Sequence, residues 1–523
     1  MANGNPTHSS PWTDTLLAPF GRTGYRTAGD LLFQSPPPLP QEAWDLRDEA
    51  DTSDEDDESW LTGDDDDVNN NNNEKEVERA QETNSTLRAK NRSTYTGHDD
   101  QLPADEEPVV VKEDPTPQSA IAAWNIHFSS RPQLQLARED ALPFAIGQSL
   151  GGGGVGVVYE THIDGVPLAL KRTWTRKMST QQLNEIKILS RMSKNRHRHV
   201  VELIGSYVKK ERRGFEIGML IWPVAQTDLA ALLHDIGVLT QYYWKYLETD
   251  CDESPQLASS VVEKIRESME PLLALIPSGV SRPSLSLRGD VLQLLPMCGL
   301  RVRRSLGCIA NAVAYLHEQN IRHKDLKPSQ ILLSAQGLWL ADFGWSADMS
   351  ELSSSVTSGG DVITAKYQAP ERANLQPCGR AEDIFSLGCI FLEMTYCTSP
   401  LPSDIPRPWL QRAWSFQANL KHVQDWMEPL YTAGSIAENF KEDGLYRIVE
   451  CIARLPRLLV PMLAPVSNNR PSIQDVLHVL SATPLVANGT TAFIADCCAP
   501  RMHLTSVWEI ADIIEHDGET NET

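Results

Sequence analysis

The hydrophobic pattern changes character along the chain, and this change restricts the possible folds most. Between residues 144 and 224, short apolar runs of strand length alternate with Gly-rich or Asp-Gly turns, as in a series of antiparallel hairpins. One segment, 179–192, instead places its apolar residues at helical spacing. Beyond Asp228 the pattern becomes mainly helical. We therefore predict a bilobal α+β fold, with a small antiparallel β-sheet lobe that carries one main helix, and a larger, mainly helical lobe.

The first 115 residues are acidic and low in complexity. They hold 9 basic against 27 acidic side chains, within a formal net charge of -23 for the 523-residue chain. Such a segment buries too little apolar surface to offset the entropy lost on ordering, so we predict a disordered leader. Two roles stay open for it: a docking segment for regulatory proteins, or a solvated leader that keeps the protein soluble.

The rest of the chain divides by composition and periodicity. We predict a linker at 116–142, a folded domain at 143–482 and a C-terminal tail at 483–523. Within the domain, the small lobe covers 143–228 and the large lobe 229–482. Residues 237–299 fit neither neighbour and include a charged helical piece at 259–276. We expect an insertion in a loop there, either partner-specific or variable surface. A helix predicted in the tail, 505–516, presents Trp508 and three isoleucines that could pack on the large lobe.

Composition also excludes several classes of protein. No stretch reaches the roughly 18 to 20 apolar residues of a membrane-spanning helix, and the N-terminal sequence has no secretory signal. We therefore expect a soluble intracellular protein with no membrane partner, in the cytoplasm by default and with the nucleus as the alternative. Beyond residue 115 the charge is nearly balanced, so a nucleic acid, which calls for a basic face, is not an expected partner.

The nine cysteines show no spacing typical of a metal site or a disulfide framework. Cys497 and Cys498 are adjacent, so a metal or redox pair is one interpretation. Ordinary reduced thiols in a tail are the simpler interpretation for an intracellular protein, and we adopt it at this point.

A glycine-rich segment begins the small lobe. Gly151, Gly153, Gly156 and Val158 form a G-x-G-x-x-G-x-V spacing, which lets a backbone approach phosphates closely. The same glycine spacing occurs in dinucleotide-binding folds, where a helix must follow it. Here a strand and an Asp-Gly turn follow, so a hairpin over a nucleotide is favoured.

A lysine and a glutamate follow at suggestive positions. Lys171 ends an apolar strand, where a solvated edge lysine would be the ordinary interpretation. If the glycine loop covers ATP, the Lys171 ammonium would instead bind the α- and β-phosphates. Glu185, in the predicted helix, is then the natural ion partner, although in another context it would be a plain surface residue.

The most informative segment is IRHKDLKPSQILL at 321–333, which is followed by LWLADFGW. The order and spacing resemble the catalytic loop and the metal-binding Asp-Phe-Gly of the eukaryotic protein kinase family. The resemblance implies that Asp325 is the base for the substrate hydroxyl, that Lys327 steadies the transferred phosphoryl group, and that Asp342 holds magnesium.

Further landmarks follow in the family's order and extend the resemblance over residues 144–480. The segment TAKYQAPE, from Thr364 to Glu371, is similar to that of serine/threonine kinases, in which the threonine helps hold the catalytic aspartate. Asp383 resembles a buried helix aspartate that supports the catalytic loop, and Arg470 resembles the arginine that pairs with Glu371. The implied activity is that of a serine/threonine protein kinase with ATP and Mg²⁺.

The resemblance also implies a nucleotide site. The hinge places Ile221 at the gatekeeper position, then Trp222 and Pro223; because proline has no N–H, adenine recognition would use neighbouring backbone groups, notably that of Val224. An acidic residue, Asp228, stands where the ribose would lie. The residues expected at the nucleotide are Leu150, Gly151, Gly153, Gly156, Val158, Ala169, Lys171, Glu185, Val224 and Asp228.

Two residues depart from the family's pattern. Gln330 replaces an asparagine whose side-chain oxygen would bind the second magnesium; we expect Gln330 and Asp342 to be the metal ligands, with weakened binding because the amide is one methylene longer. Lys324 replaces the arginine that binds an activation-loop phosphate bidentately. The loop before Glu371 holds several serines, which are candidate phosphorylation sites or simply flexible residues.

Three functions are compatible with these residues. The first is an active serine/threonine kinase that phosphorylates other proteins. The second is a pseudokinase, a nucleotide-binding or scaffolding module in which the leader and the insertion bind regulatory proteins. The third is a small-molecule kinase of related fold, which the A-P-E segment and the long activation loop make less suitable.

Overall fold

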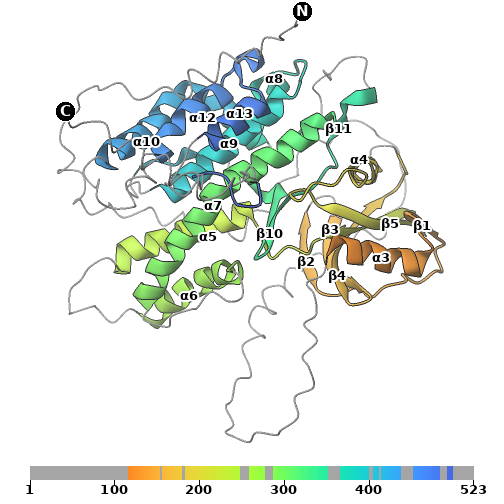
Figure 1. Cartoon of the computed structure of the whole chain (residues 1–523). Helices are drawn as coiled ribbons and strands as arrows, with labels where there is room; N and C mark the ends of the chain where they lie inside the picture. Colours follow the sequence, from red (N-terminus) through yellow and green to blue (C-terminus); the bar gives the residue numbers. More distant parts are fainter. Residues whose placement is uncertain are drawn as a thin grey trace, which may run out of the picture.

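The computed structural model describes residues 116–498, apart from 154–155, 180–182, 248–257, 277–286, 352–364, 400–404, 412–413, 438–450 and 483–491. The described chain forms a sheet-containing lobe and a helical lobe, side by side (Figure 1). The acidic leader and the predicted tail helix lie outside the described residues. None of the described helices is both long and apolar enough to cross a membrane.

The small lobe is built on a six-stranded sheet. The strands are β1 (Gln133–Leu136), β2 (Ser149–Gly153), β3 (Gly156–Ile163), β4 (Val166–Thr175), β5 (Glu202–Glu211) and β6 (Gly214–Trp222). Their spatial order is β1-β5-β6-β4-β3-β2, and all neighbours are antiparallel except β1 and β5. The predicted antiparallel sheet is therefore present as a core of five strands, and a sixth, parallel strand extends it.

Alternation along β4 separates the two faces of this sheet. Leu168 and Leu170 are buried beneath helix α3 (Pro117–Phe128), in one cluster with its Trp124. Because successive side chains of a strand point to opposite faces, Ala169 and Lys171 face the other way. On that side lies α4 (Asn184–Met192), the main helix predicted from the sequence.

The predicted linker, 116–142, is instead part of the small lobe. Thr116 caps α3 through its side chain, and Trp124 donates its indole N–H to the Arg131 carbonyl at 2.7 Å. A Cβ on Gly205 would come within 2.3 Å of the Trp124 ring, so the missing side chain on β5 makes room for the indole. The linker interpretation was therefore wrong. Three buried residues on one face of α3, Ala120, Ala123 and Trp124, are enough to pack this short helix on the sheet.

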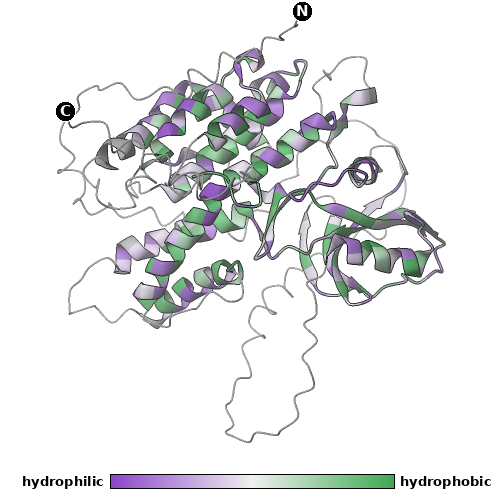
Figure 2. Cartoon of the chain, in the orientation of Figure 1, coloured by the Kyte–Doolittle hydropathy of each residue, from purple (hydrophilic) through white to green (hydrophobic). Residues whose placement is uncertain are grey.

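The large lobe is mainly helical, as predicted. Its helices are α5 (Leu229–Tyr242), α6 (Ser259–Ala274), α7 (Leu287–Glu318), α8 (Pro370–Ala373), α9 (Ala381–Thr398), α10 (Val423–Ala437), α12 (Pro456–Met462) and α13 (Ile473–Ser481). The longest of these, α7, runs through the middle of the lobe and carries both hydrophobic and hydrophilic residues (Figure 2).

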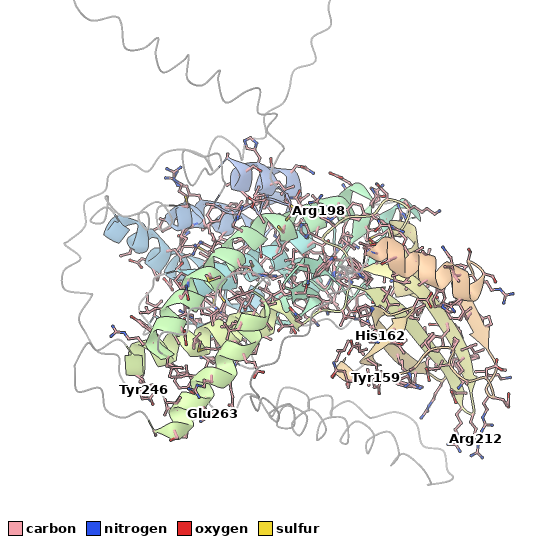
Figure 3. The ribbon with its side chains drawn as sticks, turned by 60° about the horizontal axis from the view of Figure 1, so that its bottom comes forward. Tyr159, His162, Arg198, Arg212, Tyr246 and Glu263 are labelled. Carbon is pink, nitrogen blue, oxygen red and sulfur yellow. The ribbon has the colours of Figure 1, made fainter. Side chains whose placement is uncertain are left out.

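The segment 237–299 is not a simple loop insertion. Helix α5 continues to Tyr242 and is followed by a π-helical turn, and α7 already begins at Leu287. Between them, α6 buries Ile265, Met269 and Leu272, which share one helix face, in the main core beside α7. The described parts of this segment, 237–247, 258–276 and 287–299, are thus mainly helical and extend the lobe. In Figure 3, Tyr246 and Glu263 lie at the end of the molecule opposite Arg212, which is at the β5–β6 turn.

Short strands carry the loops that face the small lobe. They are β7 (Thr227–Asp228), β8 (Ile321–Arg322), β9 (Ile331–Ser334), β10 (Gly337–Leu340) and β11 (Ala347–Asp348). The order β10-β9-β7 forms one small sheet, and β11 pairs with β8. The loop from β8 to β9 therefore lies beside the segment from β10 to β11, and these two segments contain Asp325 and Asp342.

Candidate active site

Lys171 joins the two lobes through its ammonium group. Its Nζ donates to Glu185 Oε2 at 2.8 Å and to Asp342 Oδ1 at 3.0 Å. Strand β4 supplies the lysine, α4 the glutamate, and the segment after β10 the aspartate. Residues 171 and 342 are thus brought together from opposite lobes, as the sequence-based account requires.

Electrostatics keep this cluster charged. Burial alone would lower the pKa of Lys171, but the Glu185 and Asp342 carboxylates outweigh it and hold that pKa above its usual range. Burial opposes ionisation of Asp342 too, yet the Lys171 charge and hydrogen bond keep the Asp342 pKa below its ordinary value. Burial raises the pKa of Glu185, and the Lys171 charge only partly offsets this. Asp342 is therefore the more strongly ionised of the two acids.

Asp325 lies in the loop between β8 and β9. Its carboxylate is buried and pairs with Lys327 Nζ at 3.0 Å. A single helical turn, Pro328–Gln330, follows and leads into β9. Asp325 and Lys327, which the sequence placed in the catalytic loop, thus form an ion pair. A carboxylate that can accept a proton lies beside a cation.

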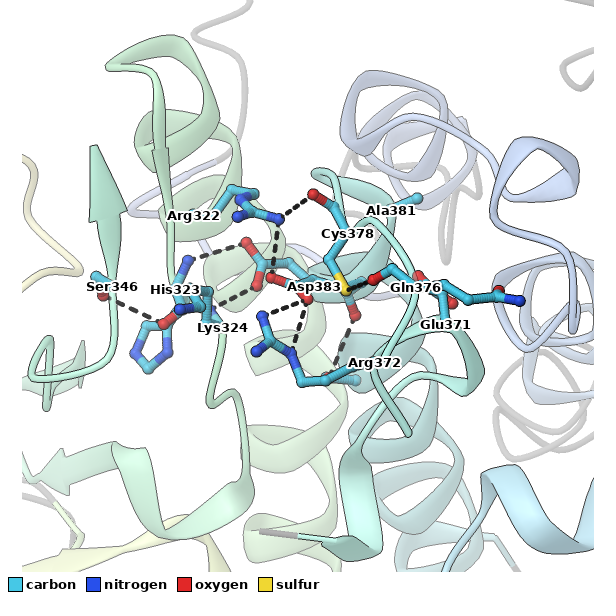
Figure 4. A network of polar contacts seen from close by, with 12 residues as sticks. Arg322, His323, Lys324, Ser346, Glu371, Arg372, Gln376, Cys378, Ala381 and Asp383 are labelled. Atoms are coloured by element: carbon cyan, nitrogen blue, oxygen red, sulfur yellow. Dashed lines mark hydrogen bonds and ion pairs between the residues drawn. The ribbon is translucent and has the colours of Figure 1, made fainter. Parts of the chain in front are cut away.

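Asp383 fixes the position of this loop through hydrogen bonds (Figure 4). Its carboxylate accepts the backbone N–H groups of His323 at 3.0 Å and Lys324 at 2.9 Å, and the His317 side chain donates to it at 2.9 Å. Burial favours the neutral acid, but these donors outweigh it and lower the pKa of Asp383 to about 2. Lys324 has φ 71°, in the left-handed region, and the Asp383 bonds keep it in this unusual conformation.

The segment around Asp342 is fixed from both lobes. Asp342 itself has φ 61°, and Phe343 is fully buried with its ring 5.2 Å from that of His323. From α4, the Asn184 amide donates to the carbonyls of Gly344 at 3.1 Å and Ser346 at 2.9 Å. Sequence reasoning missed Asn184, although its place next to Glu185 on the same helix was a usable signal.

Gln330 faces Asp342, but with its nitrogen. Its Nε2 donates to Asp342 Oδ2 at 3.0 Å, so the amide oxygen does not face the same point as the carboxylate. The predicted pair of metal-facing side chains is adjacent. The Gln330 amide group would have to rotate by half a turn before Gln330 and Asp342 could both offer an oxygen to the same cation.

Two ion pairs fix the segment after the serine-rich loop. Arg470 binds Glu371 bidentately at 2.6 and 2.7 Å, as the sequence predicted. Sequence reasoning missed a second pair, in which buried Arg372 donates twice to Glu382, the residue before Asp383. A small pocket next to Asp325 is lined by Tyr367 and Arg372, among others. Thr364 and most of the loop serines lie outside the described residues.

Several of the predicted nucleotide residues lie on the neighbouring strands β2, β3 and β4. Leu150 and the glycines belong to β2 and β3, and Val158 on β3 pairs with Lys171. Ala169 pairs with Ile221 at the end of β6, next to the Trp222-Pro223 turn. These residues border the face that carries Lys171.

Asp228, predicted at the ribose, also caps a helix. Its carboxylate caps α5 by accepting the Ala231 N–H at 3.0 Å, and burial raises its pKa above the ordinary value. A partner at the ribose would therefore share a side chain already engaged with the helix. Val224 directly follows Pro223 in the chain, and its role at the adenine stays a prediction.

Comparison with known proteins identifies part of this arrangement. Residues 295–480 match the family model described as a protein kinase domain. The match includes the segments of Asp325, Asp342 and Asp383, whereas Lys171 and Glu185 precede it.

Individual relatives share shorter stretches. The chain is 34% identical over 123 residues to a probable serine/threonine-protein kinase PkwA of Thermomonospora curvata, 32% over 140 residues to MAP3K epsilon protein kinase 1 of Brassica napus, and 32% over 113 residues to serine/threonine-protein kinase PknB of Mycobacterium tuberculosis. These stretches cover 23%, 27% and 21% of this chain, and 16%, 10% and 18% of the relatives. The chain therefore spans a tenth to a fifth of their length.

The family match and the geometry agree with each other. The matched segment supplies the loop of Asp325 and the Asp342 carboxylate, and the unmatched small lobe brings Lys171 to the same carboxylate within a two-lobed α+β fold. The chain thus contains a protein kinase domain, which the family model matches over residues 295–480.

Proposed function

We propose that this protein is an ATP- and magnesium-dependent serine/threonine kinase that phosphorylates other proteins. The observation that carries the proposal is the position of Lys171, which bonds Glu185 and Asp342 at the same time. In this family of reactions, catalysis is mostly the positioning of phosphates and the neutralisation of their charge, and both the lysine–glutamate pair and the metal-binding aspartate must be in place.

Each residue has a defined task in the proposed reaction. Lys171 binds the α- and β-phosphates, and Asp342 with Gln330 would hold Mg²⁺, which when bound neutralises phosphate charge. Asp325 accepts the proton of a serine or threonine hydroxyl as the hydroxyl oxygen bonds to the γ-phosphorus. The bond to the bridging oxygen breaks, ADP leaves, and Lys327 balances charge on the transferred phosphoryl group.

A peptide is the proposed phosphoryl acceptor. The pocket beside Asp325 is lined by Tyr367 and Arg372, from the segment around the A-P-E sequence, so an acceptor that reaches Asp325 would pass along that segment. If label from ATP entered only small alcohols in a screen of both kinds of acceptor, a small-molecule kinase would be the correct assignment instead.

One observation favours a pseudokinase as the second candidate. Gln330 donates its amide N–H to Asp342, a contact that occupies one oxygen of the expected metal ligand. In this case the domain would bind nucleotide or partners without turnover, and the acidic leader would serve as a docking segment for regulatory proteins.

The decisive experiment compares two single variants. Purified wild type, Asp325→Asn and Asp425→Asn are incubated with γ-labelled ATP, Mg²⁺ or Mn²⁺, and a generic basic protein. Asp425 is an exposed carboxylate on α10 that pairs with His422, three residues away, so its variant controls for the loss of a charge. Loss of the base should lower the rate by about 10²- to 10⁴-fold, while the control matches wild type. Equal label in all three proteins would refute catalysis by this site.

A further inference from the structure

Four metal-ligating side chains meet at a point outside the candidate active site. His199, Cys308, Cys497 and Cys498 bring one nitrogen and three sulfurs within 4.8 Å of one another. They come from three separate segments: the connection between α4 and β5, the middle of α7, and the part of the C-terminal tail at 492–498. We propose that these four residues bind a structural Zn²⁺ ion that fastens the tail to both lobes.

The interatomic distances match a tetrahedral zinc site. With Zn–S bonds of about 2.3 Å and a Zn–N bond of about 2.0 Å, ideal tetrahedral angles give S···S separations of about 3.8 Å and S···N separations of about 3.5 Å. Cys308 Sγ lies 3.6 Å from Cys497 Sγ, and His199 Nε2 lies 3.5 Å from Cys497 Sγ and 3.0 Å from Cys498 Sγ. These three separations lie within about half an ångström of the ideal values, and all four ligand atoms lie within 4.8 Å of one another.

The histidine is already oriented as a ligand. His199 is 5% exposed, and its Nδ1 donates to the Leu338 carbonyl at 3.0 Å. This bond fixes the proton on Nδ1 and leaves Nε2 with a lone pair that points at the thiols. A backbone carbonyl bonded to the distal nitrogen is the usual support of a metal-binding histidine.

The ligand set indicates a structural rather than a catalytic ion. Three cysteines and one histidine fill all four positions of zinc, so no position is left for water or substrate. Binding would deprotonate the three thiols and give the cluster a net charge of -1. Arg198 lies beside it and donates to the Cys497 carbonyl at 2.6 Å, so its positive charge would stabilise an anionic site.

The tail reaches this point because α7 leaves room for it. A Cβ on Gly307 would come within 2.5 Å of Ile494, and the Gly307 N–H donates to the Phe493 carbonyl at 2.8 Å. Phe493 and Ile494 are buried in the main core, which places the two following cysteines next to Cys308. The interpretation of Cys497 and Cys498 as ordinary tail thiols does not account for this position.

The ion would connect the tail to the candidate active site. The backbone of His199 and Val201 bonds that of Leu340, two residues before Asp342, at 2.9 and 3.1 Å. Zinc on His199 would thus fix the connection that follows α4, the helix of Glu185. The proposal does not depend on the protein's activity, because the four ligands are separate from the residues that face ATP.

Metal content tests the proposal directly. Full-length protein is purified under reducing conditions without chelator, and zinc and iron are measured by elemental analysis beside the variants Cys308→Ser and Cys498→Ser. Cys397→Ser is the matched control, because its half-buried thiol lies outside the cluster, near the Leu233 carbonyl. We expect about one zinc per chain in wild type and control, and a loss of roughly tenfold or more after a brief chelator wash in the two ligand variants.

Cobalt binding keeps the test decisive if the variants fold poorly. Wild-type protein stripped of metal and reduced should bind one Co²⁺ with the visible bands of a tetrahedral ion and thiolate charge transfer in the near ultraviolet, and Zn²⁺ should abolish both. The proposal would be overturned by wild type that neither contains zinc nor binds Co²⁺ in this way, by iron in its place, or by a Cys308–Cys497 disulfide in the freshly purified protein.

Discussion

At the scale of single residues, the contact between Gln330 and Asp342 decides how a metal ion can be held. Magnesium requires oxygen ligands at about 2.0–2.1 Å in nearly octahedral geometry. Here the amide offers N–H to the carboxylate, and its extra methylene lets it reach that far. To offer oxygen instead, Gln330 must turn, and Asp342 then loses one hydrogen-bond donor while it keeps Lys171.

Gln330→Asn should therefore raise kinase activity. A shorter amide at this position would present its oxygen without reaching the Asp342 carboxylate, so we expect kcat to increase about tenfold, corresponding to about 1.4 kcal/mol of transition-state stabilisation. The measurement is kcat as a function of Mg²⁺ concentration, with saturation shifted to lower metal in the variant. Gln474→Asn on α13 is the control, since its exposed amide donates to Glu318, away from Asp342. Identical curves for wild type and Gln330→Asn would show that the amide has no part in metal binding.

At the scale of elements, the pattern of the chain predicted the strands β2 to β6, α4 and the catalytic loop, because each has strong local periodicity or a motif of fixed spacing. Helix α3 was missed because its buried face is only Ala120, Ala123 and Trp124, and because its partner, Gly205, lies about 80 residues further along the chain. A local signal did exist in Thr116 and Pro117, the cap and the first residue of the helix. In the expected insertion, the helical piece at 259–276 is present as α6, but its packing against α5 and α7 was not expected.

Removing the α3 contact should destabilise the small lobe. Trp124 is 2% exposed, so Trp124→Ala should lower the free energy of unfolding by about 3–5 kcal/mol through lost burial and a cavity beside Gly205. Trp174→Ala, at a site 45% exposed on β4, should cost far less. Chemical denaturation of both variants, followed by near-ultraviolet circular dichroism, compares them. Equal small losses would mean that α3 does not belong to the folded lobe.

At the scale of the whole molecule, residues far apart in sequence meet at two places. Lys171, Asp325 and Asp342 could be assigned from sequence only because their motifs resemble those of a known family; nothing local to Lys171 specifies a partner 171 residues away. The histidine–cysteine cluster had no such motif, and its most distant members are 299 residues apart. Motif spacing therefore predicted the residues of the candidate active site, but it gave no sign of the histidine–cysteine cluster.

The central claim is that groups from both lobes act on one nucleotide, and calorimetric titration with Mg·ATP tests it most directly. Wild type should bind a single equivalent. Lys171→Met should weaken binding by about tenfold or more, because a buried charge no longer meets the phosphates, and Asp342→Asn should remove the dependence of binding on Mg²⁺. Asp325→Asn should bind as wild type does while failing to transfer the phosphoryl group. Unchanged, metal-independent binding in Lys171→Met and Asp342→Asn would contradict the account.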